Sequence, residues 1–487
     1  MDPKSSLMLR ACIIAGAMFF LFMVLVCLLA SPIALITFLS AVFLAVYFLF
    51  HLEIQSERER KPRKLPPVMF VAIILLTCFF IGALFAEGLA HYAIPLSAII
   101  AVGLALTFWT NFLTIPLAIY HKQNEEREGK YLQRYPKVSI IVPAYNEEEN
   151  LATTIEALLE ADYPLKEIII VDDGSTDGTL NIARRYIDRG VKVCHKENGG
   201  KASAINYGLL FATGEIIVLV DADTIIGYSA LREIVKRFED PEVVAVCGNI
   251  KILNTSNWLT KCQALEYCIN INILRRAFDT FGAVPVVPGS LGAFRKEVLE
   301  AGGKYDRVTV TEDFDVTIQT LKTGKVVQAS SYALAYTRAP ETISGLYKQR
   351  LRWYRGNIQS ILRHKDAFIN TRYGFLHSLA FPFIFLSLII LPFIGLLVWG
   401  TVFLMLFLGY WQSALFWFLF FVVLQFLLSL LALELDEAPR SLAWYSPLFV
   451  LGYKQFLDFI IIKSLFDVLL KRNIGWTSAK RKQEKHQ

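Results

Sequence analysis

Two carboxylates at the end of an apolar segment are the residues whose type and spacing most directly indicate chemistry. Residues 216–220 are all aliphatic, and Asp221 and Asp223 follow them two positions apart. Side chains two residues apart on an extended backbone point to the same face. Two such carboxylates at the carboxyl end of a buried strand suit a hard divalent cation, which commonly binds substrate phosphates as well. Because Asp is also frequent in turns, a plain polar turn is the alternative.

Similar polar turns follow two other apolar, β-branched segments. The segments 138–143 and 167–171 lead into polar residues at 146–147 and 172–173. Segments with helical apolar spacing separate the strands, at about 151–159, 177–188 and 202–212. This alternation predicts a parallel sheet with right-handed crossovers, whose strands end at one edge. A series of acids at that edge favours a ligand site over unrelated solvated loops.

The chain has glycines near the second turn but neither of two common nucleotide-binding motifs. Gly174 and Gly178 would let the backbone approach a ligand closely. Neither G-x-G-x-x-G nor a Walker A pattern occurs in the chain, which disfavours a dinucleotide-binding fold and a P-loop enzyme. Ser175 or Thr176 is predicted to cap the helix that follows.

Two further acids, Glu312 and Asp313, precede a predicted helix at about 314–323. Carboxylates are favoured at a helix N-terminus by the helix dipole, so capping is the alternative to a chemical role.

A later helix is predicted to carry a basic and aromatic face. Gln349, Arg352 and Trp353 stand at positions i, i+3 and i+4 and therefore share one face. Arg binds phosphate oxygens, and an indole offers an apolar platform for a sugar ring. Next to a membrane, the same Arg–Trp pair could form an interfacial belt. Gly289 and Ser290 lie in an earlier small-residue segment, where the backbone is predicted to pass close to another group.

Composition divides the chain into membrane-like and globular parts. Of its 487 residues, 55% are hydrophobic, and the mean hydropathy is +0.45. Apolar segments of the length needed to span a bilayer, about 20 residues, occur near 8–30, 33–50, 67–86, 95–120, 375–433 and 447–470. The predicted organisation is an N-terminal transmembrane block of about four helices (1–120), a globular domain (121–365), a C-terminal transmembrane block of three to four helices (366–470) and a basic tail (471–487).

The net charge of +6 is concentrated beside the apolar segments, at 51–66 and in the tail. By the positive-inside rule both regions, and with them the globular domain, are predicted to be cytoplasmic. These charges lack interleaved aromatic residues, so membrane lipids are predicted partners and nucleic acid is not. The seven cysteines are odd in number and lack Cys-x-x-Cys spacing, so neither a disulfide framework nor a cysteine metal site is predicted.

Five segments in a fixed order carry a family resemblance: VDDGSTDGT (171–179), GGKASAIN (199–206), DAD (221–223), TED (311–313) and QRLRW (349–353). They resemble processive, membrane-embedded glycosyltransferases of family 2, which include cellulose and hyaluronan synthases. The resemblance covers about 137–365. It implies an α/β fold: a cytosolic, Rossmann-like GT-A domain with a mixed, mostly parallel sheet, inserted between two helical transmembrane blocks. Segments 245–249, 292–295 and 475–478 look most similar to the poly-β-1,6-N-acetylglucosamine synthases of this family.

The resemblance also implies roles for individual residues. Those that would contact the nucleotide sugar are Asp172, Asp173, Lys201, Asp221, Gln349 and Arg352. Those that would hold Mg²⁺ or Mn²⁺ are Asp223 and Asp221. Asp313, beside Glu312, resembles the general base that deprotonates the acceptor hydroxyl. Those that would contact the acceptor are Trp353, Gly289 and Ser290.

The expected function is inverting polymerisation of a β-linked polysaccharide from a UDP-sugar, with UDP-N-acetylglucosamine as the expected donor and with export of the polymer. One displacement needs charge neutralisation at the diphosphate and one base at the acceptor oxygen. The alternatives are a single transfer to a lipid acceptor and a transporter with a regulatory nucleotide-binding domain, which needs no base. The expected location is the plasma membrane, as a multi-pass protein, and the resemblance leaves room for accessory subunits.

Overall fold

A computed structural model describes residues 134–301, 305 and 311–472, with positions 100, 114, 117–122, 124–125 and 132 before them. Nearly all of the predicted N-terminal block (1–120) and of the basic tail (471–487) lies outside the described residues, as does the segment 475–478. The described residues belong to two compact units. The sheet unit comprises 127–267, 282–385 and the chain from 463, and the helical unit comprises 268–281, 386–462 and the positions up to 126.

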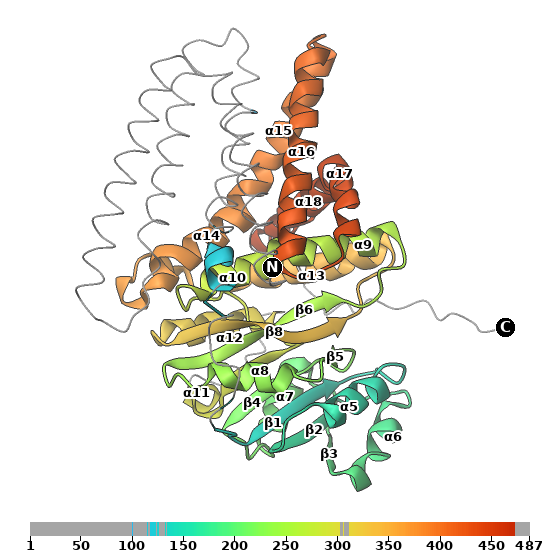
Figure 1. Cartoon of the computed structure of the whole chain (residues 1–487), viewed down its shortest axis with the longest axis vertical. Helices are drawn as coiled ribbons and strands as arrows, with labels where there is room; N and C mark the ends of the chain where they lie inside the picture. Colours follow the sequence, from blue (N-terminus) through green and yellow to red (C-terminus); the bar gives the residue numbers. More distant parts are fainter. Residues whose placement is uncertain are drawn as a thin grey trace, which may run out of the picture. The chain divides into compact units, whose positions relative to one another are not determined.

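The sheet unit is built on an eight-stranded sheet in the order β3-β2-β1-β4-β7-β6-β8-β5 (Figure 1). The strands are β1 Val138–Ala144, β2 Lys166–Asp172, β3 Val191–His195, β4 Ile216–Leu219, β5 Ile225–Ile226, β6 Val243–Ile252, β7 Gly292–Arg295 and β8 Val326–Thr337. The first four strands are parallel, as are β6 and β8. β7 runs antiparallel between β4 and β6, and β5 runs antiparallel to β8. The predicted mixed α/β sheet is therefore confirmed.

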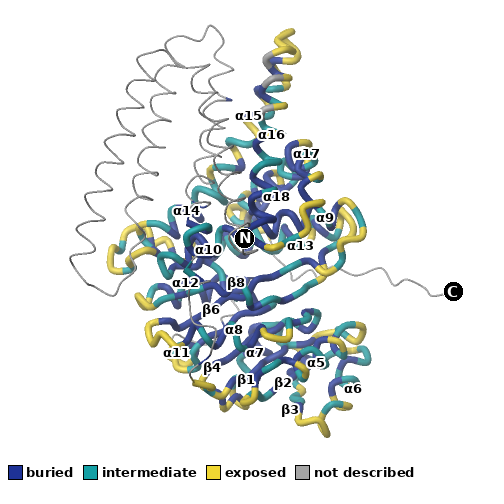
Figure 2. Tube along the Cα trace, viewed as in Figure 1, coloured by how far each residue is buried: buried dark blue, intermediate teal, exposed yellow. Residues whose placement is uncertain are grey.

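The sheet unit also contains helices, several of which pack on the strands. They are α5 Leu151–Glu160, α6 Thr179–Arg184, α7 Lys201–Leu209, α8 Ala230–Arg237, α9 Trp258–Glu266, α11 Lys296–Ala301, α12 Glu312–Lys322, α13 Ile343–Arg363 and α14 Phe381–Phe385. α7 packs on β1 and β2, and α8 packs on β6 and β8. Strands buried on both faces need apolar side chains throughout, which explains the unbroken apolar sequence of β4 and the buried strands in Figure 2.

One local prediction is wrong. Neither Ser175 nor Thr176 caps α6, which begins after Gly178. Instead Ser175 Oγ accepts a hydrogen bond from Asn146 N–H (3.0 Å), and Thr176 N–H donates one to Asn146 Oδ1 (2.9 Å), so this turn is tied to the turn after β1. The segment 258–279 consists of α9, a π-helical turn at Tyr267–Asn272 and α10 (Ile273–Asp279), which follow one another directly.

In the helical unit, two basic side chains bind the C-terminal end of a long apolar helix. The helices here are α10, α15 Leu391–Phe407, α16 Trp411–Leu435, α17 Ser446–Leu448 and most of α18 Lys454–Leu469. The carbonyl oxygen of Leu435 accepts hydrogen bonds from Arg276 Nη1 (2.7 Å) and Lys122 Nζ (3.0 Å). Arg276 also pairs with the buried Asp436 at 3.1 Å. The last carbonyls of a helix lack intrahelical partners and carry negative partial charge, so these contacts stabilise the end of α16.

Two segments of the described chain are long and apolar enough to cross a membrane by length and composition: Leu376–Phe407 and Trp417–Leu435. α18, which covers much of the apolar segment 447–470, has 16 residues and two i,i+4 ion pairs, Lys454–Asp458 and Lys463–Asp467. The number of C-terminal crossings stays a prediction. None of the cysteines that the structure describes is in a disulfide.

One partly buried carboxylate joins the amino-terminal ends of the four parallel strands. Glu167, on β2, accepts hydrogen bonds from Ser139 Oγ on β1, from Lys192 Nζ on β3 (2.8 Å) and from Thr213 N–H (2.7 Å) before β4. Burial raises the pKa of Glu167, but the hydrogen bonds from Lys192, Ser139 and Thr213 outweigh it and hold the pKa at about 2. The charged form is therefore the one that stabilises this end of the sheet.

Replacing this carboxylate with a neutral amide should weaken the sheet in a pH-dependent way. Glu167→Gln is expected to lower the free energy of unfolding by about 1–3 kcal/mol at neutral pH, because it removes a charged acceptor. The folded-state pKa of about 2 lies below the ordinary value of 4.5. The stabilisation is therefore present above about pH 4.5 and is lost as the pH falls toward 2.

The check is thermal unfolding in detergent at several pH values. The Tm difference from wild type should be largest near neutrality and should shrink below about pH 4. Glu160→Gln, at an exposed position of α5, is the control and should leave Tm nearly unchanged. An equal Tm difference at all pH values would contradict the assigned role of Glu167.

Candidate active site

A lysine connects acids from two distant segments. Asp221 follows β4, Lys201 is the first residue of α7, and Glu312 is the first residue of α12. Lys201 Nζ lies 2.5 Å from Asp221 Oδ1 and 3.6 Å from Glu312 Oε1. Burial lowers the pKa of Lys201, but the charges of Asp221, Glu312 and Asp313 outweigh burial and raise that pKa above its ordinary value. The structure thus brings together three of the sequence segments that were predicted to carry chemistry.

The two acids at the start of α12 have different contacts. Glu312 faces Lys201, whereas Asp313 Oδ1 accepts a hydrogen bond from Phe314 N–H at 2.8 Å. Burial raises the pKa of Glu312; the charge of Lys201 opposes this shift and that of Asp313 adds to it. Both acids lie in the first turn, where the helix dipole favours negative charge. The predicted helix is confirmed, and Glu312 at its start lies within ion-pair distance of Lys201.

The turn after β2 holds the loop that leads into Lys201. Asp173 is buried, and its carboxylate accepts hydrogen bonds from the backbone N–H groups of Gly199 (3.1 Å) and Gly200 (2.7 Å) and from Lys196 Nζ (2.6 Å). Gly200 has φ +85°, a conformation that disfavours any residue with a Cβ. Asp173 therefore fixes the entry into α7.

The neighbouring acid, Asp172, leaves one oxygen for other contacts. Its Oδ2 lies 2.7 Å from Nδ1 of His195, its register partner on β3. Its Oδ1 is buried and has no hydrogen-bond partner within the described part of the chain. A buried carboxylate oxygen normally has a donor, so this atom is suited to one from a ligand.

The small-residue segment before β7 approaches the lysine. A Cβ added at Gly289 would lie 2.5 Å from Lys201 Nζ and 3.4 Å from Asp221 Oδ1. The backbone here is brought in because β7 pairs with β4, with Gly292 opposite Leu219. Gly289 is buried and Ser290 is partly exposed. The predicted close approach is thus observed at Gly289, and the group approached is the Lys201–Asp221 pair.

Helix α13 presents its basic and aromatic face to the start of α12. Gln349, Arg352 and Trp353 precede Gly356 by seven, four and three residues, so all four share one face of the helix. A Cβ at Gly356 would lie 2.8 Å from the backbone nitrogen of Thr311, the residue before Glu312. The face that was predicted from spacing therefore includes the glycine that packs against the residue before Glu312.

A polar network joins the same two helices farther along. Asp315 is 2% exposed and accepts hydrogen bonds from Arg363 Nη1 (3.2 Å) and Gln319 Nε2 (2.6 Å). Its other oxygen lies 3.0 Å from His364 Nε2. Sequence reasoning missed Asp315, although its place two residues after Asp313 could have signalled a buried acid.

Asn206 and Tyr305 were also missed. The Asn206 amide donates to the Tyr305 carbonyl (2.8 Å) and accepts from the Tyr305 N–H (2.9 Å). The Tyr305 hydroxyl is buried and has no hydrogen-bond partner among the described residues. Burial, with the charges of Asp313 and Glu312, raises the pKa of Tyr305 well above its ordinary value, so the hydroxyl keeps its proton. Asn206 ends the GGKASAIN segment, which was the available signal.

The donor chemistry of Asp221 and Asp223 fits a divalent cation that is completed by substrate oxygens. Both side chains are partly exposed after β4. No group of three or more His, Cys, Asp or Glu side chains that could form a cage occurs in the described ranges. Mg²⁺ usually binds one or two carboxylates and takes its other ligands from water and phosphate. The two acids therefore suit a metal that arrives with a diphosphate.

The fold and the family model agree on the class of the domain. Residues 139–303 match the model described as Glycosyl transferase family 2, so the chain carries a family 2 glycosyltransferase domain, as predicted. The mannosyltransferase PcManGT from Pyrobaculum calidifontis, solved in complex with GDP-Man and Mn²⁺, superposes with a TM-score of 0.52. The two chains are 21% identical, and the match covers 77% of this chain and 100% of that one. This likeness confirms the GT-A fold.

Two curated relatives have the same printed name. The poly-beta-1,6-N-acetyl-D-glucosamine synthase of Staphylococcus epidermidis is 34% identical over 252 residues, which are 51% of this chain and 61% of that protein. The synthase of that name from Staphylococcus aureus (strain COL) is 33% identical over 247 residues, which are 50% of this chain and 60% of that protein. The match thus spans about three-fifths of each relative's length. The predicted similarity to these synthases is confirmed.

Separating α13 from α12 should impair the site while leaving the fold intact. Gly356→Ala places a Cβ against the Thr311 backbone, so the helix or the start of α12 must shift. Such overpacking typically costs about 1–3 kcal/mol. We expect glycosyl transfer to fall by about tenfold or more, because 1.4 kcal/mol of lost positioning corresponds to a factor of ten.

The measurement is the initial rate of transfer with matched amounts of folded protein. Gly400→Ala, on α15, is the control, because a Cβ there meets nothing within 4 Å. Equal activity of the two variants would show that the α12–α13 contact does not matter for transfer.

Proposed function

We propose that the protein is a membrane-embedded, inverting glycosyltransferase that polymerises a β-linked polysaccharide from a UDP-sugar, with UDP-N-acetylglucosamine as the donor. The observation that carries this proposal is the convergence of Lys201, Asp221 and the Glu312–Asp313 pair under the α13 face. The names of the two staphylococcal relatives support the donor and the product.

In the proposed reaction an acceptor hydroxyl attacks the anomeric carbon of the donor, and UDP leaves. Asp313 takes the hydroxyl proton as general base, because Glu312 is already engaged by Lys201. Lys201 and Arg352 offset the negative charge that develops on the diphosphate. A single displacement inverts the anomeric configuration and requires no carboxylate nucleophile.

The nucleotide would lie against the carboxyl ends of β1, β2 and β4. The Oδ1 atom of Asp172, which has no hydrogen-bond partner among the described residues, would accept a hydrogen bond from the uracil ring. Asp173 is proposed to contact the uridine as well as to hold the glycine loop. Gln349 would join Arg352 at the diphosphate, since both lie on the same face of α13.

The acceptor would enter between the Gly289 backbone and α13. Trp353 offers an apolar face for the terminal sugar ring, and Gly289 and Ser290 would border the path of the chain. A stacking platform of this kind suits an acceptor that is itself a sugar chain, which favours the polysaccharide over a lipid acceptor.

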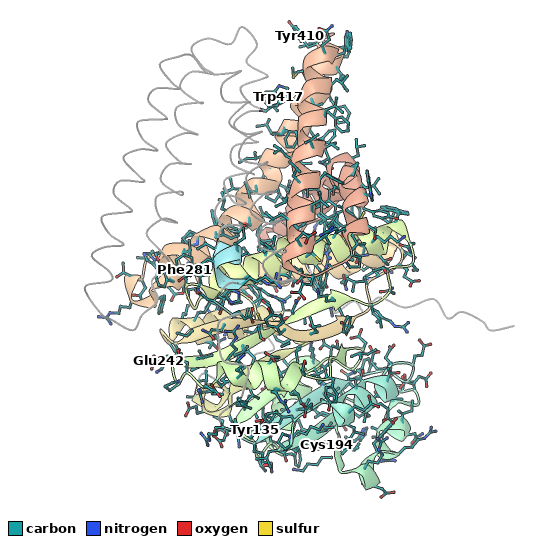
Figure 3. The ribbon with its side chains drawn as sticks, in the orientation of Figure 1. Tyr135, Cys194, Glu242, Phe281, Tyr410 and Trp417 are labelled. Atoms are coloured by element: carbon teal, nitrogen blue, oxygen red, sulfur yellow. The ribbon has the colours of Figure 1, made fainter. Side chains whose placement is uncertain are left out.

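The C-terminal helices support a membrane location. Exposed apolar side chains on the α15–α16 hairpin include Phe403, Phe407, Trp411 and Leu415. Tyr410 lies at the turn between the two helices, as Figure 3 shows, where an aromatic residue suits a membrane interface. We propose a multi-pass plasma-membrane protein in contact with lipids, with its sheet unit in the cytoplasm and its polymer exported.

Removing the proposed base should stop transfer and spare donor binding. Asp313→Asn is expected to lower turnover by about 10²–10⁴-fold, the usual contribution of general base catalysis. The Kd for UDP should change little, because the base contacts the acceptor. Turnover in vesicles and UDP calorimetry on the same preparation check this, with the exposed Asp188→Asn as control. Unchanged turnover would remove Asp313 from the mechanism.

The proposed reaction should depend on a divalent metal. Mg²⁺ or Mn²⁺ at Asp223 and Asp221 would offset charge on the leaving diphosphate. Chelation with EDTA is expected to abolish transfer, and either ion should restore it. Asp223→Asn should raise the Mg²⁺ concentration that gives half-maximal rate by about tenfold or more. Loss of a residue that only hydrogen-bonds to a metal ligand already changes metal affinity by about 10–100-fold, and Asp223 is proposed to be a ligand itself. Full activity in EDTA would contradict a metal at these acids.

The function itself is tested with the purified full chain in lipid vesicles, Mg²⁺ and separate radiolabelled UDP-sugars. A high-molecular-weight product from UDP-N-acetylglucosamine, cleaved by a hydrolase specific for β-linked N-acetylglucosamine, is the expected result. A single lipid-soluble labelled species would instead establish a lipid glycosyltransferase. Binding of UDP-sugars without any transfer would favour a nucleotide-regulated transporter.

A further inference from the structure

Arg350 is a charged side chain in the interior of the sheet unit. It is 1% exposed and is among the largest fully buried side chains of the described chain. Its Nη2 lies 2.8 Å from Oε2 of Glu266, at the C-terminal end of α9, and the Glu266 side chain is only 9% exposed. An Arg guanidinium does not lose its proton in a protein, so a charge at this depth depends on its carboxylate partner.

The same guanidinium stacks on the indole of Trp353. The central carbon of the Arg350 guanidinium lies 4.3 Å from the centroid of that ring, and Nη1 donates a hydrogen bond to Gln349 Oε1 at 3.2 Å. Glu266 restrains the guanidinium plane, and this plane in turn restrains the indole. Trp353 is partly exposed, so the guanidinium covers one side of the ring while another part remains accessible.

The position of Arg350 on α13 relates this stack to the site. Arg350 precedes Trp353 by three residues, and Trp353 precedes Gly356 by three. At 3.6 residues per turn, Arg350 lies on the flank of the face that Gly356 sets against Thr311. Trp353 lies closer to that face than Arg350 does, and the guanidinium stacks on its ring.

We propose that Arg350 and Glu266 are positioning residues that set the orientation of the Trp353 ring for the terminal sugar of a polysaccharide acceptor. This inference rests on the proposed function. With one side of the indole covered, a sugar ring stacks only on the accessible side, in one register relative to Asp313. Arg350 and Glu266 thus govern how the acceptor is retained between additions.

The first test compares product length and UDP affinity for Arg350→Lys in the full chain. Lysine keeps the charge near Glu266 but lacks the planar group that stacks on the indole. We expect the mean polymer length to fall about fivefold or more, which corresponds to a loss of about 1 kcal/mol in acceptor binding. The Kd for UDP should stay within about twofold of wild type. Arg355→Lys is the matched control, since Arg355 lies on the same helix and pairs with the buried Asp467.

A double-mutant cycle separates positioning from general stability. In a Trp353→Leu background, Arg350→Lys is expected to shorten the polymer by less than about twofold, because its effect acts through the ring. Equal effects of Arg350→Lys in both backgrounds would overturn the proposal. If Arg350→Lys does not fold, Glu266→Gln replaces it in the same cycle, with the same expectation.

The product made by the wild-type protein shows whether the proposed function or only the present inference has failed. Absence of polymer from wild type with every UDP-sugar overturns the proposed function, and the present inference with it. Wild-type polymer together with unchanged length in both Arg350→Lys and Glu266→Gln overturns this inference alone.

Discussion

The arrangement of the site depends on one ammonium group. Lys201 lies between Asp221, which ends the β4 segment, and Glu312, which begins α12, and a third acid, Asp313, is next to them. Carboxylates gathered in a partly buried space repel one another and would otherwise take up protons. The positive charge of Lys201 offsets this repulsion. The same carboxylates in turn raise the pKa of Lys201. The loop that delivers Lys201 is in turn held by Asp173.

The mixed topology of the sheet explains how distant segments reach this lysine. The parallel strands bring their carboxyl ends to one edge, as any such sheet does. The antiparallel β7 then inserts between β4 and β6 and brings the backbone of Gly289 beside the Lys201–Asp221 pair. Glu167 ties the strands together at their opposite ends, so the proposed binding site and this hydrogen-bond network lie at opposite ends of the same strands.

The helix pair α12 and α13 connects the proposed base with the proposed acceptor platform. Gly356 permits close contact at Thr311, and Asp315 joins α12 to Arg363 and His364 at the far end of α13. These two contacts lie at different points along α13, so they restrain both its distance from α12 and its rotation about its own axis. The orientation of Trp353 therefore depends on the backbone position of α13 as well as on the Arg350 guanidinium that stacks on the ring.

The sequence by itself determined the strands β1, β2 and β4, the helix α12 and the shared face of Gln349, Arg352 and Trp353, because apolar periodicity and helical spacing are local properties. It also carried the motifs that indicated the family. Only the tertiary structure decided which acid faces Lys201, that Asn206 holds Tyr305 from 99 residues away, and that Arg350 lies between Glu266 and Trp353. Such contacts depend on how separate elements pack, and the same packing overruled the predicted cap at Ser175 or Thr176.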